Sequence, residues 1–183
     1  MVPLSALWLA ILLSAAFVFI ASSILHMLLP FHRSDYRQLP EEEKVRSVLR
    51  GLPQGSYVFP FTNHKEMNSP AMVEKYKQGP VGFMSVAPDG PPVMGKFLGL
   101  WFVYCLLVSF FTAYLTGHTV AAGMNYRVVF RVAGTAAFMA YGLGPFVNSI
   151  WKGQPWRITI KEVIDGLIYA LLTAGTFGWL WPR

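Results

Sequence analysis

The stretch LSALWLAILLSAAFVFIASSILHMLL, from Leu4 to Leu29, decides the fold because it contains no Asp, Glu, Lys or Arg. About 20 apolar residues, each rising ~1.5 Å, cross a hydrocarbon core about 30 Å thick. The segment is therefore predicted to be a membrane-spanning helix. No basic residue precedes Leu4, and the apolar run exceeds the roughly 7 to 15 residues of a signal-peptide core, so we expect the helix to be retained.

Three further apolar stretches predict three further spans, at Phe97 to Gly117, Val132 to Trp151 and Ile160 to Trp181. Proline removes a backbone donor and collides with the preceding turn, so a kink is expected near Pro145 in the third stretch. Only 13% of the residues are charged, against about 25% in ordinary soluble domains. The sequence thus predicts an all-α membrane protein with four transmembrane helices.

A connection of about 66 residues separates the first span from the others, which gives three segments: 1–30, 31–96 and 97–183. Glutamates after Pro40 and glycine at Gly51 predict one short helix, and Ser69 and Gly79 bracket another. Aromatic and β-branched residues predict short strands at Tyr57–Phe61 and Val81–Ala87. A small α+β connection buries too little surface to be stable alone, so we expect it to dock on the bundle end or the headgroups.

The basic residues predict the orientation, because Lys and Arg near spans stay on the cytoplasmic side. All of them except Arg127, Arg131 and Arg183 lie in the first and third connections. We therefore expect a bacterial inner-membrane protein with both termini non-cytoplasmic and the 31–96 connection cytoplasmic. The basic residues are interleaved with acidic ones, which argues against nucleic acid as a partner.

Small residues mark helix contact faces, since helices in lipid associate where their backbones approach closely. In the fourth span, Gly166, Ala170, Ala174 and Gly178 recur every four residues, and Ala136, Ala140 and Gly144 form a similar row in the third. These faces predict close helix packing. The expected partners are the lipid bilayer and a protein partner or a second copy of the chain.

Asp165 is a possible polar intramembrane site, because a carboxylate at the bilayer centre needs water, a partner or a proton. Tyr169 and Thr173 continue the polar side of the same helix, which would suit a proton or cation path. The alternative is an ion pair with Lys161, four residues earlier. Arg131 could likewise pair inside the bundle or anchor at the interface, although it enters from the opposite side to Asp165.

Histidines and carboxylates near the end of the first span suggest a divalent metal site. The candidate ligands are His26, His32, Asp35, His64 and Glu66. Pro30 interrupts the run between the first two histidines, and no HExxH or cysteine pair accompanies them. Solvated or capping histidines are the alternative interpretation.

Motifs for other chemistry are absent: there is no GxSxG, GxxxxGK[ST] or GxGxxG, and no paired Ser-Lys or Asp-Asp in the spans. No catalytic residue can be assigned, and no cofactor is expected. The single cysteine, Cys105, cannot form a disulfide within the chain.

Two stretches, Ser149 to Trp156 and Asp165 to Ala170, resemble small polytopic membrane proteins of bacteria that are described as uncharacterised. The resemblance implies a helical membrane fold and no particular activity. The sequence therefore favours a structural, accessory or scaffolding membrane component. The alternatives are an oligomeric ion or small-solute transporter using Asp165, and a metal-dependent membrane enzyme using the histidines.

Overall fold

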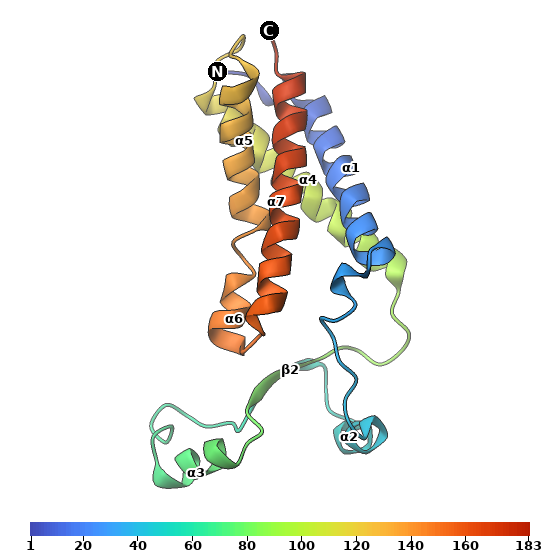
Figure 1. Ribbon diagram of the computed structural model, residues 1–183, viewed down its shortest axis with the longest axis vertical. Helices are drawn as coiled ribbons and strands as arrows, with labels where there is room; N and C mark the ends of the chain where they lie inside the picture. Colours follow the sequence, from blue (N-terminus) through green and yellow to red (C-terminus); the bar gives the residue numbers. More distant parts are fainter.

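A computed structural model describes all 183 residues and contains four helical segments long and apolar enough to cross a membrane (Figure 1). They run over Trp8–Leu28, Met94–Thr119, Tyr126–Lys152 and Trp156–Leu180. The predicted class, a helical bundle of four spans with a small α+β connection after the first, is confirmed.

The first span ends in an irregular way that matters for the site. A short 3-10 turn, η1 (Leu4–Ala6), leads into α1 (Trp8–Ser23), which continues as a π-helical turn, η2 (Ile24–Leu28). Leu29 is extended, and a second 3-10 turn, η3 (Pro30–His32), begins at the proline. Proline is tolerated in the first turn of a helix because the N–H that it lacks would have no partner there. The chain therefore turns sharply just past the helix end.

The other spans comprise two continuous helices and one broken helix. The continuous ones are α4 (Met94–Thr119) and α7 (Trp156–Leu180). The third span consists of α5 (Tyr126–Tyr141) and α6 (Phe146–Lys152), with the break where a kink was predicted, at Gly142 to Pro145. The side chain of Asn125 caps α5 by accepting a hydrogen bond from the Val128 backbone N–H, 3.2 Å away.

Helix α7 lies centrally in the bundle, against α5 along most of its length and against α1 on another side. Helix α4 crosses the others at an angle and packs on α1 and α5 (Figure 1). Both termini lie at one end of the bundle, where the Val2 N–H donates to Gly117 O at 2.8 Å and the Gly123 N–H to Pro182 O at 2.9 Å. The connection and the start of α7 lie at the other end.

The small-residue face of α7 packs inside the chain. A methyl group added at Gly166 would lie 2.5 Å from the Gly142 Cα, so the two backbones are almost in contact there. Ala170 and Ala174 are buried. The contact face predicted in the third span is partly wrong. The fully buried alanines of that span are Ala133 and Ala137, whereas the predicted Ala136 and Ala140 line a groove facing α4.

The connection contains the predicted elements with slightly shifted bounds. It comprises α2 (Glu42–Leu49), β1 (Gly55–Phe59), α3 (Pro70–Gln78) and β2 (Gly82–Val86), and the strands pair antiparallel. Ser69 Oγ caps α3 by accepting from the Met72 N–H, as expected. Beyond its first few residues, the connection projects away from the bundle rather than docking on its end (Figure 1). Met72 is its one buried apolar residue, so it has little apolar surface committed to any contact.

Replacing Gly166 with alanine should destabilise the bundle, because the added methyl group would meet backbone atoms of α5 that cannot rotate away. Overpacking of this kind lowers the free energy of unfolding by about 1–3 kcal/mol. The measurement is thermal unfolding in detergent, with Gly99→Ala in α4 as the matched control because a methyl group there meets no atom within 4 Å. Equal midpoints for the two variants would contradict the close approach of α5 and α7.

Candidate metal centre

Three potential ligands from three elements converge at the end of the bundle where the connection begins. His26 comes from η2, His32 from η3 and Asp165 from the third turn of α7. Their ligand atoms all lie within 4.8 Å of one another. The π-helical turn rotates His26 relative to its position in a regular helix, and the turn at Pro30 returns His32 beside it. The sequence interruption at Pro30 thus brings the histidines together.

His32 and Asp165 are in direct polar contact. His32 Nε2 lies 2.8 Å from Asp165 Oδ2, an ion-pair distance, although the two groups are not well aligned for a hydrogen bond. Asp165 Oδ1 is buried without a partner, on a side chain that is 4% exposed. Buried polar atoms in proteins are almost always paired. A buried carboxylate oxygen without a partner, beside two imidazoles, suits a site for a cation.

Asp35 orients the His32 ring from the other side. Its Oδ2 lies 2.6 Å from His32 Nδ1, and its Oδ1 accepts a hydrogen bond from Lys161 Nζ at 2.6 Å. Burial alone would raise the pKa of Asp35, but the hydrogen bonds from Lys161 and His32 outweigh it and hold that pKa below its usual value. Asp35 is therefore a carboxylate acceptor, so we assign the His32 proton to Nδ1. Nε2 is then free to bind a metal, as in carboxylate–histidine–metal triads.

Lys161 attaches the turn that carries His32 to α7. Its Nζ donates to Phe31 O at 2.5 Å and to Ser34 Oγ at 3.1 Å, in addition to Asp35. Arg157, one turn earlier, donates to Ser34 O at 3.1 Å. The ion pair considered between Lys161 and Asp165 does not form, because the lysine instead reaches the turn after η3. Sequence reasoning missed this role, since the partners of Lys161 are about 130 residues away in the chain.

A cavity of about 390 Å³ opens beside the ligands. His26 and His32 line one side of it, and the His26 ring packs edge-on against the His32 ring at 4.3 Å between centroids. The remainder is lined by Arg33, Asp35, Tyr36, Ile158 and Glu162. An ion held by the three ligands would therefore lie beside this cavity on its histidine side, and catalytic metal sites need such access.

The other predicted residues lie outside this cluster. Tyr169 is one turn further into the bundle than Asp165, with its hydroxyl buried and unpaired, and Thr173 Oγ1 donates to Tyr169 O at 2.9 Å. Arg131 is exposed on α5 and forms no ion pair. His64 and Glu66 are exposed in the segment between β1 and α3, and the structure does not bring them to the three ligands.

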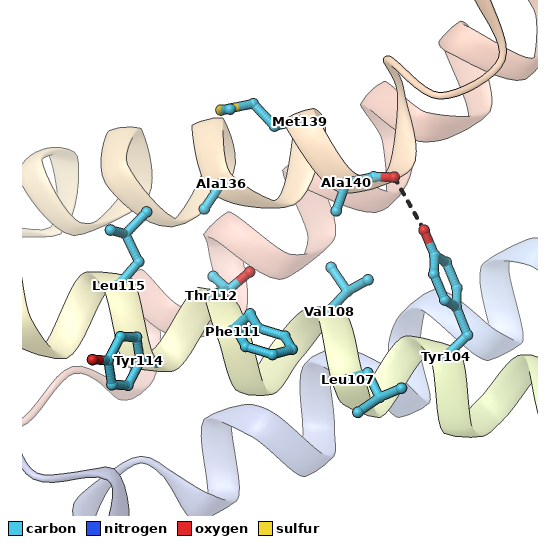
Figure 2. Close-up of a pocket in the computed structure, with 10 residues that line it drawn as sticks. All are labelled: Tyr104, Leu107, Val108, Phe111, Thr112, Tyr114, Leu115, Ala136, Met139 and Ala140. Atoms are coloured by element: carbon cyan, nitrogen blue, oxygen red, sulfur yellow. Dashed lines mark hydrogen bonds between the residues drawn. The ribbon is translucent and has the colours of Figure 1, made fainter. Parts of the chain in front are cut away.

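The largest cavity is a different feature, a groove of about 650 Å³ between α4 and α5 (Figure 2). Nine of its ten lining residues are hydrophobic, and its one drawn hydrogen bond joins the Tyr104 hydroxyl to Ala140 O at 3.0 Å. Midway along two spanning helices, such a groove faces lipid. It contains hydroxyl groups but no charged residue or histidine, and it is not the candidate site.

Comparison with protein families, curated proteins and solved structures finds no match to this chain. The functional argument therefore depends on the geometry of the site itself. Two imidazoles and one carboxylate form a donor set that suits Zn²⁺ or Fe²⁺ in sites with open coordination positions.

Replacing Lys161 with alanine should loosen the turn at residues 30–36, because Asp35 and the Phe31 carbonyl lose their donor. Leaving a buried acceptor unpaired weakens local structure by about 1–3 kcal/mol, which corresponds to roughly 5- to 150-fold faster amide exchange. Hydrogen–deuterium exchange of the detergent-solubilised protein measures this effect. Lys152→Ala, which removes an exposed lysine with no ion pair, is the control and should leave exchange in the turn unchanged.

Proposed function

We propose that this multi-pass protein of the bacterial inner membrane binds a divalent transition-metal ion through His26, His32 and Asp165, in a site of the catalytic kind. The observation that carries the proposal is the convergence of these ligand atoms within 4.8 Å, with Asp165 Oδ1 and His32 Nε2 lacking hydrogen-bond partners. A metal-dependent membrane enzyme is the function that this geometry supports best.

The residues around the ligands support a metal site rather than a polar cluster that binds nothing. Asp35 fixes the His32 tautomer, and Lys161 in turn fixes Asp35, which is the outer layer that metal-binding histidines usually have. The cavity beside His26 gives a small molecule access. The alternative is an imidazolium at His32 bridging two carboxylates, which the same distances would suit and which would bind no metal.

We further propose that this centre lies on the cytoplasmic side. The basic residues of the first and third connections flank the same end of the bundle as the site, and cytoplasmic retention of such residues supports that assignment. Both termini would then be non-cytoplasmic. Exposed Trp151 and Trp156 lie near this end, where indole rings favour the membrane interface.

An accessory or scaffolding role is the second candidate, and the 31–96 connection supports it. The connection projects from the bundle and exposes Phe61, Val81 and Phe83, which could contact a protein partner. Repeated native purification as a lone monomer would argue against this role.

Transport finds less support. The five main cavities lie at the bundle end, in the connection or between α4 and α5, and none of these follows the polar side of α7.

Titration with Co²⁺ tests metal binding, because the visible absorption of the ion reports its ligands. We expect one equivalent to bind to the purified protein in detergent, and binding to be lost in His26→Ala and Asp165→Asn. His26 is exposed, so its replacement leaves the packing intact. Asp35→Asn should weaken binding by about 10- to 100-fold, the usual effect of removing an outer-layer partner.

His118→Ala is the matched control, because His118 is an exposed histidine at the opposite end of the bundle whose Nδ1 bonds only to Tyr114 O. This variant should bind Co²⁺ like the unmodified protein. A folded protein that binds no Co²⁺, or that loses none in His26→Ala, would overturn the proposal and favour the bridging imidazolium.

A further inference from the structure

His26 borders a second cavity as well as the polar one. This second cavity, of about 310 Å³, lies between the end of the first span and the start of α4. Its lining is mostly apolar and consists, besides His26, of Ser22, Ser23, Met27, Met94, Phe97, Leu98 and Trp101. We call it the chain groove. The polar cavity and the chain groove thus share one lining residue, the metal-ligand candidate His26.

The chain groove has a fixed inner wall and a lipid-facing rim. The Trp101 indole N–H donates to Ser22 Oγ at 2.7 Å, and the ring stacks on Tyr104 with centroids 5.4 Å apart. Met27, Met94 and Phe97 are each more than half exposed on the outer side of the bundle. In a bilayer, these side chains would meet acyl chains. The groove therefore opens toward lipid, whereas the polar cavity opens toward the water-exposed end of the bundle.

The charges around the polar cavity suit an anion once a metal is bound. Arg33, Arg157 and Lys161 balance Asp35, Glu162 and Asp165 in sign and number. Neutral imidazoles add no charge, so a divalent ion would leave the site with excess positive charge. Basic pockets between transmembrane helices on the cytoplasmic side are typical binding sites for lipid headgroups.

We infer that the site takes an anionic phospholipid from the surrounding bilayer, with its phosphate at the metal and Arg33 and one acyl chain in the chain groove. This inference depends on the proposed metal site and names its ligand class. A soluble phosphate ester would use the polar cavity alone and leave the groove without a function. His26, which lines both cavities, lies near the end of the first span, where a lipid headgroup and its chains would join.

The experiment titrates delipidated, Co²⁺-loaded protein in detergent with dioleoyl phosphatidylglycerol and counts bound lipid by native mass spectrometry. Dioleoyl phosphatidylcholine serves as the zwitterionic comparison. Leu98→Trp fills the chain groove, and Leu107→Trp is its matched control on the same helix, because Leu107 lines the groove between α4 and α5. Arg33→Gln tests the headgroup end, with exposed Arg37→Gln as its control.

We expect one phosphatidylglycerol to bind and Leu98→Trp to weaken it by about tenfold or more, since a few buried methylene groups account for such a factor. Arg33→Gln and removal of the metal should also weaken phosphatidylglycerol binding. The control variants Leu107→Trp and Arg37→Gln should leave this binding unchanged. Co²⁺ binding without lipid should be unchanged in Leu98→Trp.

Equal binding of the two lipids, or binding unaffected by both Leu98→Trp and metal removal, would overturn the inference while leaving the metal site in place. A soluble ligand is indicated if inorganic phosphate binds the Co²⁺ protein and phosphatidylglycerol does not, and that result also overturns it. Failure of the unmodified protein to bind Co²⁺ would instead overturn the proposed function, so the two failures are distinguishable.

Discussion

The hydrogen bonds between Lys161 and the turn after Pro30 are the contact on which the site depends. Lys161 Nζ bonds to the Phe31 carbonyl and to Asp35, and Asp35 bonds to His32. Charged hydrogen bonds strengthen where water is largely excluded, and the Asp35 side chain is only 5% exposed. Without this attachment, only the Arg157 hydrogen bond to Ser34 O and the His32–Asp165 contact would hold the turn against α7. One lysine thus couples the end of the first span to the start of the fourth.

Close backbone packing supplies the other half of the arrangement. A close backbone approach between α7 and the end of α5, Gly166 against Gly142, falls one residue after Asp165. It also falls where the third span breaks between α5 and α6. Because the helices cannot separate there, the Asp165 carboxylate is held in a buried position facing the histidines. A break in one helix and a glycine in its neighbour therefore determine where the carboxylate lies.

The fold was largely predictable and the site only in part. Long charge-free runs fix the spans, and the helices of the connection follow from their caps, such as Ser69. Four crossings put the first and third connections at one end of the bundle, and His26, His32 and Asp165 lie near those connections. Their convergence was not predictable, because it requires a π-helical turn at His26 and a chain reversal at Pro30. From the sequence, Pro30 indicates only that the helix ends. Helix rotation, which directs Asp165 toward the histidines rather than toward Lys161, likewise leaves no local signal.

The composition of the site also suits its depth in the membrane. A divalent ion with two neutral imidazoles and one carboxylate retains one positive charge, which is unfavourable near hydrocarbon unless an anion offsets it. A phosphodiester carries one negative charge and brings its own apolar chains, so it would neutralise the centre and fill the chain groove together. A soluble phosphate would leave the apolar surface of the chain groove wet. The positive charge of the ligand set with its ion and the apolar groove on the other side of His26 therefore favour the same kind of molecule.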